Sequence, residues 1–174
     1  MLIKKTLLVA AVAAVAGLSL NASANTATGS FTVTLVVNKT CTVTTTAASN
    51  ITLGPVNAGG TTTIANGTFA AFCSNLTPFT VGLAPSNANT AGAGVLHGAI
   101  GGNNATIAYQ LYQNAGGTTI WGNTASVGNA GNGESGTGAG VATAQNFTVY
   151  ANATGSTNVQ PDTYSDTVTI TVNF

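Results

Sequence analysis

Charged side chains are nearly missing from this 174-residue chain, which holds three Lys or Arg, three Asp or Glu, and one histidine. So few basic residues exclude the positive footprint of a nucleic-acid-binding surface. His97 is the one candidate general base, and it lies in a Gly-rich stretch where a solvent-facing role is commoner. Glu134 lies in a Gly-rich segment, while Asp162 and Asp166 flank a turn, which aspartates commonly shape. We therefore predict no enzyme, no catalytic residue and no cofactor.

Long apolar runs are confined to the first residues of the chain. Lys4 and Lys5 precede an apolar run over 7–20, and the small residues Ala-Ser-Ala at 22–24 fit a signal-peptidase site. The run is shorter than the ~20 residues of a membrane-spanning helix. Residues 1–24 are therefore predicted to be a signal peptide, and the mature chain is predicted to be exported and soluble. About 150 residues remain, enough for one domain with a core.

Cysteine is also scarce, with Cys41 and Cys73 alone. Their spacing is not that of a CxxC motif and His97 is distant, so a metal or redox site is disfavoured. An even number of cysteines in an exported chain favours a disulfide. It would close a loop of about 33 residues and contribute roughly 3–4 kcal/mol on the chain-entropy model.

Thr, Asn, Ser and Gly supply the polarity that charges usually provide, since Lys39 is the one basic residue beyond position 24. Such a nearly neutral surface suits close packing against copies of itself.

Two motif matches in the sequence have little weight. GNGESG at 131–136 fits a glycine-rich dinucleotide motif but lacks the flanking strand and helix of a dinucleotide site. The N-x-T triplets at Asn38 and Asn146 arise by composition.

No helical period follows residue 24, and β-branched residues alternate with polar ones between turn clusters. The predicted strands cover 31–37, 41–45, 51–53, 61–65, 68–73, 79–83, 107–112, 147–151 and 167–174. The segment 114–140 is predicted to be a strand fragment at 118–121 followed by an extended surface loop. Many short strands with one disulfide favour an antiparallel β-sandwich of immunoglobulin-like type.

Both ends of the mature chain carry regular apolar alternation. Near its start, FTVTLVV places four apolar side chains on one face: Phe31, Val33, Leu35 and Val37. At its end, Val168, Ile170, Val172 and Phe174 alternate with polar residues. A terminal strand with a final aromatic fits either the closing strand of an outer-membrane barrel or an unfinished sheet edge. The few aromatics, short central strands and cysteine pair favour the unfinished edge.

Four features together resemble the spore coat protein U domain, which occurs in subunits of archaic (Csu-type) chaperone–usher pili. They are YSDTVTITVNF at the end, IAYQLYQNAGGTTIWGN at 107–123, ITLGPVNAG at 51–59, and the placement of Cys41 and Cys73. The resemblance covers essentially the whole mature chain. Two departures are LGPV, where members often carry an aromatic before the glycine, and the drawn-out loop at 122–140.

The resemblance implies an incomplete immunoglobulin-like sandwich over 39–174 that lacks its final strand, so that a hydrophobic groove stays open. A periplasmic chaperone would lend a strand to that groove. At the outer-membrane usher, the extension of the next subunit, here 25–38, would replace it. Carried over by position, Phe31, Val33, Leu35 and Val37 are the donor residues. Val168, Ile170, Val172 and Phe174 form the acceptor edge that meets the chaperone.

The family implies copies of the chain, the chaperone, the usher and a tip adhesin as partners, with passage through the periplasm to a surface pilus. Adhesion and biofilm formation would follow, and the chain fits a rod subunit because it has no room for a receptor-binding domain. Three alternatives stay open. The chain could be a secreted coat or matrix protein that folds residues 31–37 into its own groove, a small outer-membrane barrel, or an enzyme relying on His97.

Overall fold

The computed structural model describes residues 25–46 and 49–174. The chain divides into two units, Met1–Val36 and Val37–Phe174, and we call the second unit the body. The predicted signal peptide, residues 1–24, lies outside the described residues. Among the residues that are described, no helix is long and apolar enough to cross a membrane.

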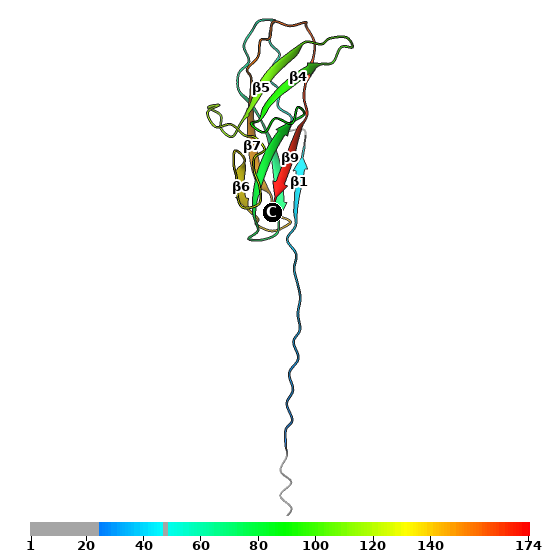
Figure 1. The fold of residues 1–174 in the computed structure, drawn as a ribbon, viewed down its shortest axis with the longest axis vertical. Coiled ribbons are helices and arrows are strands. Elements are labelled where there is room, and N and C mark those ends of the chain that lie inside the picture. Colours follow the sequence, from blue (N-terminus) through cyan, green and yellow to red (C-terminus); the bar gives the residue numbers. More distant parts are fainter. Residues whose placement is uncertain (1–24, 47–48) are drawn as a thin grey trace, which may run out of the picture. The chain divides into compact units, whose positions relative to one another are not determined.

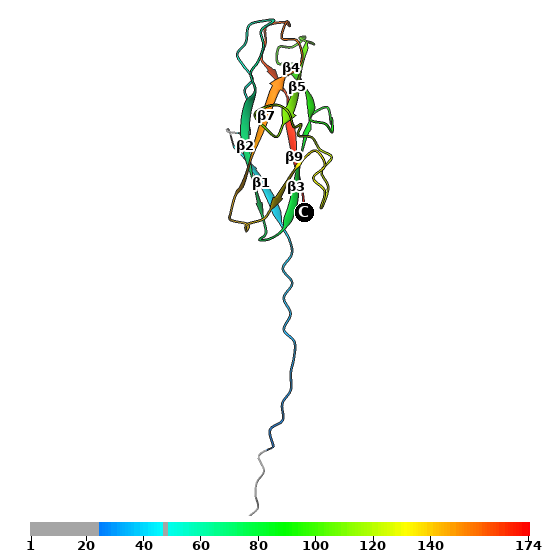
Figure 2. The ribbon, with the colours of Figure 1, turned by 90° about the vertical axis from the view of Figure 1, so that its left-hand side faces the viewer.

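Nine strands build the body (Figure 1). They are β1 (Cys41–Thr45), β2 (Ala65–Cys73), β3 (Pro78–Pro85), β4 (Ala93–Gly98), β5 (Thr106–Tyr112), β6 (Glu134–Thr137), β7 (Gln145–Ala153), β8 (Tyr164–Ser165) and β9 (Val168–Asn173). Six of them form one sheet in the order β1-β2-β7-β5-β4-β8, and three form a second sheet in the order β6-β3-β9. Figure 2 shows β2 and β7 in one layer and β3 and β9 in the other.

Every strand pair is antiparallel, so the predicted all-β antiparallel sandwich is confirmed. The alternation of buried and exposed residues explains the layers. In β2, Phe69, Ala71 and Cys73 are buried and the residues between them are not, which is the pattern of a strand with one face on a core. In β3 nearly every residue is buried, so both faces of this strand are covered.

Aromatic rings fill the space between the sheets. Phe69 from β2 stacks on Phe147 from β7 with ring centroids 5.4 Å apart, and Phe79 from β3 meets Phe147 edge to face at 6.0 Å. Trp121 contacts both Phe69 and Phe147, at 5.9 and 6.1 Å. Offset and edge-to-face geometries are the favoured arrangements of aromatic pairs.

Trp121 is completely buried, although the sequence predicted an extended surface loop after it. Its backbone N–H donates to the carbonyl of Leu111 in β5, and its indole N–H donates to the carbonyl of Val81 in β3. The residue therefore ties the two sheets together. The predicted strand fragment at 118–121 forms a single bridge, between Ile120 and Tyr112, and the predicted loop after it contains the strand β6.

Amide side chains hold the rest of this segment in place. The side-chain oxygen of Asn132 accepts hydrogen bonds from the backbone N–H and the hydroxyl of Thr124, and its amide donates to the carbonyl of Thr90. The amide of Gln113 donates to the carbonyls of Asn132 and Gly133. Hydrogen bonds from Asn and Gln side chains thus hold this segment in place, a role that salt bridges have on most protein surfaces.

Cys41 and Cys73 form a disulfide between directly opposed positions of β1 and β2, with Cα atoms 4.1 Å apart. The bond matters because β1 has only five residues and pairs with β2 alone. The disulfide holds β1, an edge strand, to β2, to which it is otherwise joined by a short ladder of hydrogen bonds.

We expect Cys41→Ser to lower the stability of the body by roughly 2–5 kcal/mol, the usual loss for a native disulfide in a small exported domain. The yield of folded protein from the periplasm, compared with wild type and with the Cys73→Ser variant, measures the effect. Unchanged yield of both variants, together with unchanged unfolding under reducing conditions, would contradict it.

Several predicted elements differ from the observed ones. Residues 51–53 form no strand, and of 61–65 only Ala65 does, while β4, β6 and β8 were not predicted. Ile51 and Leu53 nevertheless pack against the core as partly buried residues. The apolar alternation of 51–53 indicated their burial correctly, but no backbone of the described residues pairs with them to form a ladder.

No strand is assigned to residues 31–37 either, in contrast to the prediction. Strand pairing needs a partner, and the described part of the chain provides none for this segment. The side chains of Phe31, Val33, Leu35 and Val37 are 88, 84, 85 and 82 % exposed. So much exposed apolar surface at alternate positions is unusual for a single folded chain.

Candidate functional site: an open groove between two edge strands

A cavity of about 330 Å³ opens between the two sheets, on the side where each sheet ends. One sheet ends there with β1 and the other with β9, and within residues 25–46 and 49–174 neither strand has a ladder partner on its outer side. A strand edge without a partner exposes a row of backbone N–H and C=O groups. The groove therefore offers both an apolar interior and hydrogen-bonding edges.

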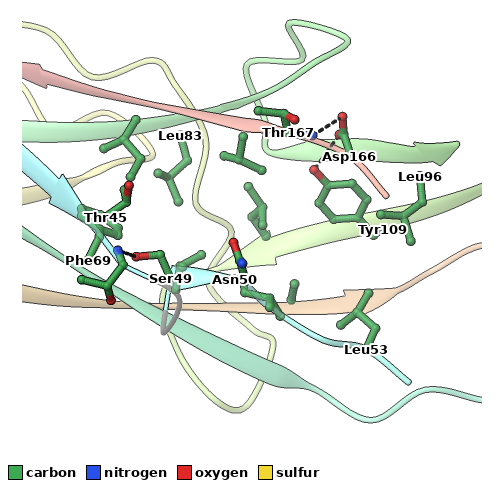
Figure 3. Close-up of a pocket in the computed structure, with 17 residues that line it drawn as sticks. Thr45, Ser49, Asn50, Leu53, Phe69, Leu83, Leu96, Tyr109, Asp166 and Thr167 are labelled. Atoms are coloured by element: carbon green, nitrogen blue, oxygen red, sulfur yellow. Dashed lines mark hydrogen bonds between the residues drawn. The ribbon is translucent and has the colours of Figure 1, made fainter. Parts of the chain in front are cut away.

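The floor of the groove is apolar and comes from both sheets (Figure 3). The floor residues are Phe69, Leu83, Tyr109, Leu111, Val149 and Ala151. Two of the four predicted acceptor residues, Val168 and Ile170 in β9, form one rim, and Ile51 and Leu53 lie on the opposite side. These positions result from strand alternation, since β9 places Ile170 opposite Leu83 and Val168 opposite Pro85 of β3.

The other two predicted acceptor residues do not line this cavity. Val172 packs against the core as a partly buried residue, and Phe174, just after β9, is 37 % exposed. β1 and β9 approach each other over part of their lengths without forming a ladder. The groove is thus open beside the first half of β9, where Val168 and Ile170 stand.

A second cavity of about 830 Å³ adjoins the first. The two share Asn50, Ile51, Leu53, Leu96 and Asp166 as lining residues, and the second is otherwise formed mainly by the segments 50–58 and 157–166. Asp166 therefore lies where the apolar groove meets the second, more polar cavity.

Asp166 is the one acidic side chain in the groove. One of its carboxylate oxygens accepts a hydrogen bond from the Tyr109 hydroxyl at 2.8 Å, and the other accepts from the backbone N–H of Thr167 at 2.7 Å. Burial alone would raise the pKa of Asp166, but hydrogen bonds from Ser86, Tyr109 and Thr167 hold that pKa below its usual value. Burial, with the adjacent carboxylate, raises the pKa of Tyr109. The pair is thus an ionised aspartate and a neutral tyrosine.

The lowered pKa of Asp166 predicts that the folded chain loses stability in acid. Because the folded-state pKa of Asp166 lies below the unfolded value near 3.8, its contribution to stability is complete above that pH and is lost as the pH falls through the folded pKa. Denaturant midpoints measured from pH 6 downward should fall more steeply in wild type than in Asp166→Asn. Identical slopes below pH 4 would contradict the prediction.

Asp162 contributes in the same direction and braces the C-terminal segment. The small loss of hydration at its carboxylate acts to raise the pKa, but hydrogen bonds from the backbone N–H of Ile100 and the amide of Asn103 hold it lower. The Asn103 amide also donates to the Tyr164 hydroxyl. Asp162 thus joins the loop after β4 to the residues that lead into β9, which is more than the turn-shaping role predicted for it.

The remaining candidate residues lie away from the groove. His97 is in β4 rather than in a loop, and Glu134 begins β6, where burial raises the pKa of its carboxyl. Neither lines either cavity. Within the described residues, no group of three or more His, Cys, Asp or Glu side chains could hold a metal ion.

Sequence reasoning missed most of the groove's floor and the place of Asp166. Tyr109 and Leu111 belong to a strand that was predicted, and their alternation marked them as inward-facing. Nothing in the sequence indicated that they face an opening rather than a covered core. Leu96 was missed because its strand, β4, was not predicted.

The fold and the groove define a class of protein: an antiparallel β-sandwich with an unfilled apolar channel between its two edge strands. The chain belongs to the Spore Coat Protein U domain family, whose model matches residues 27–171. No curated protein matches the chain significantly.

Among solved structures, one similar chain comes from the CsuC–CsuE chaperone–tip adhesion subunit pre-assembly complex of the archaic chaperone-usher Csu pili of Acinetobacter baumannii. The TM-score is 0.48 and the sequence identity 20 %. The match covers 79 % of this chain and 40 % of that chain.

Proposed function

We propose that this chain is a structural subunit of a bacterial surface pilus, assembled by exchange of a strand between successive copies. In this proposal residues 25–38 form the donor extension and residues 39–174 the accepting domain. One observation carries it: the same chain has an open apolar groove and four exposed apolar residues at alternate positions before its first strand. Adding a strand to a sheet edge is an established mode of recognition between polypeptides.

The energies suit a stable fibre. Burying one large apolar side chain contributes ~1.5–3 kcal/mol, so the four donor residues, Phe31, Val33, Leu35 and Val37, supply a large driving force together with the new hydrogen bonds. The acceptor residues Val168, Ile170, Val172 and Phe174 provide the matching edge. Since neighbouring strands lie ≈ 4.7–4.9 Å apart, seating a strand between β1 and β9 requires about 9.5 Å, and the two must separate where they now approach.

An open groove beside an unpaired edge is prone to aggregation, so a subunit of this kind needs a chaperone until a partner copy arrives. The family's place in chaperone–usher pili supports a periplasmic chaperone, an outer-membrane usher and a tip adhesin as the further partners. The subunit would pass through the periplasm and end in a cell-surface pilus that serves adhesion and biofilm formation. The nearly uncharged sequence suits a repeating rod subunit packed against its own copies.

Expression of the full chain with its chaperone and usher tests the proposal. We expect a subunit that co-purifies with the chaperone from the periplasm, and surface fibres that carry it when the usher is present. His97→Ala should leave both unchanged. A soluble, chaperone-free monomer under all these conditions would favour the secreted coat or matrix protein and contradict the proposal.

A further inference from the structure

The donor extension and the C-terminal strand carry the same pattern in opposite directions. In the extension, four apolar residues at every second position are followed two residues later by a single positive charge, Lys39. Before β9, a single negative charge, Asp166, is followed two residues later by four apolar residues at every second position. Antiparallel pairing reverses one of the two patterns, so the two then match position by position.

The matched arrangement defines one register. It pairs Phe31 with Phe174, Val33 with Val172, Leu35 with Ile170, Val37 with Val168, and Lys39 with Asp166. Directly opposed residues of an antiparallel pair lie on the same face of the sheet. Val168 and Ile170 line the groove, so this register directs Val37 and Leu35 into it as well.

Asp166 offers a negative charge to the occupant in this position. Hydrogen bonds from Tyr109, Thr167 and Ser86 favour the ionised form of its carboxylate. The side chain is half-buried and lines both cavities, and it is the one acidic side chain that lines the first cavity; Asp162 also lines the second. A half-buried carboxylate at the mouth of an apolar groove is stabilised by a cation from the occupant.

Lys39 of the same copy cannot supply that cation. Figure 3 shows Thr45, where β1 ends, with Phe69 towards one end of the groove, and Asp166 with Leu96 towards the other. β1 runs from Cys41 to Thr45, so Lys39 lies before the Cys41 end of β1, six residues back along the chain from Thr45 and on the side of Thr45 away from Asp166. Extended chain spans about 3.3 Å per residue, which places Lys39 roughly 20 Å beyond Thr45.

We propose that the extension of one copy enters the groove of the next antiparallel to β9, and that Lys39 of the entering copy pairs with Asp166 of the receiving copy to set the register. This inference rests on the proposed strand exchange and adds to it a register and a specificity-determining pair. The cation of the pair is the one basic side chain of the chain beyond position 24.

Other registers place a charge opposite an apolar side chain or turn the apolar face away from the groove. A slip of two residues one way places Lys39 opposite Val168 inside the groove, and a slip the other way places Val37 opposite Asp166. Both leave a charge facing an apolar side chain. A slip of one residue turns every apolar donor residue to the wrong face. Parallel entry with the apolar residues matched places Gly29 opposite Asp166 and Lys39 far from it.

Carbodiimide cross-linking of wild-type fibres tests the register directly, because the reagent joins an ammonium to a carboxylate in contact with it. Fibres are assembled from equal amounts of ¹⁴N and ¹⁵N copies, cross-linked, digested with chymotrypsin and analysed by mass spectrometry. We expect a Lys39–Asp166 product in which half of the linked pairs carry one label of each kind. Linkage of Lys39 to Glu134 or Asp162 instead, linkage within one copy, or no linkage in intact fibres would overturn the register.

Paired substitutions give an independent measurement. Lys39→Gln and Asp166→Asn should each speed fibre dissociation in denaturant by about two- to five-fold, and the double variant should be no faster than the faster single variant. Glu134→Gln, an acid-to-amide change away from the groove, should dissociate like wild type. Fully additive effects would contradict the pair. Fibres with a different linkage would overturn this inference alone, whereas wild-type chain that forms no fibres would overturn the proposed function.

Discussion

Deletion of residues 26–37 is expected to abolish fibre formation while leaving a body that still folds on the chaperone. The deleted segment carries the four exposed apolar residues, Phe31, Val33, Leu35 and Val37, and contributes no strand to either sheet of the body. Without it, a subunit can accept a strand but cannot donate one. Electron microscopy of the cell surface and co-purification with the chaperone measure the two outcomes. Fibres built from the truncated chain would refute strand exchange.

A point substitution separates the role of the apolar face from that of the segment's length. Leu35→Asp places a charge where the proposal buries a side chain, and burying an unpaired charge costs several kcal/mol, so fibre yield should fall by roughly ten-fold or more. Thr34→Asp is the matched control, because alternation places Thr34 on the opposite face of the strand. Equal loss of fibres in both variants would show that the segment is not seated with the proposed face inward.

Replacement of Trp121 by alanine is expected to lower the stability of the body by about 3–5 kcal/mol, the usual range for removing a large buried aromatic side chain. The substitution removes ring contacts to Phe69 and Phe147 and the hydrogen bond to the Val81 carbonyl that joins the sheets. Small domains are stable by only about 5–15 kcal/mol in all, so this loss is a large share of the total.

The yield of chaperone-bound subunit and its unfolding in denaturant measure the effect of this substitution. Trp121→Phe should lose much less, because it keeps most of the ring contacts and loses chiefly the indole hydrogen bond, at about 1 kcal/mol. His97→Ala, in an exposed position of β4, should stay within about 0.5 kcal/mol of wild type. Wild-type yield and stability for Trp121→Ala would mean that the segment containing it does not join the two sheets.

The strands that the sequence predicted well are those in which β-branched or aromatic residues alternate with polar ones. Residues 41–45 match β1, and the predictions at 68–73, 79–83, 107–112, 147–151 and 167–174 fall on β2, β3, β5, β7 and β9. Alternation is a local property, because each residue's burial depends on which face of its own strand it occupies. For the same reason the all-β class could be predicted.

Two of the missed strands contain a glycine that faces an aromatic ring of the neighbouring strand. Gly94 in β4 pairs with Tyr109, and a side chain at Gly94 would collide with the tyrosine ring. Gly136 in β6 pairs with Phe79 in the same way. A glycine in a strand leaves room for a ring from the next strand, but the sequence shows only a residue that is poor at forming strands. The third, β8, has two residues and is too short for any period to appear.

The sequence by itself determined the strand-forming segments, the sparse charges and the two alternating apolar segments at 31–37 and 168–174, because these depend on residue type and spacing alone. It also placed Lys39 and Asp166 two residues from those segments. Only the tertiary structure decided that the groove exists. Its floor draws on residues of β2, β3, β5 and β7, and it stays open because β1 and β9 end their sheets on the same side without pairing. Which strands lack a neighbour is a property of the whole sheet order, and no local pattern carries it.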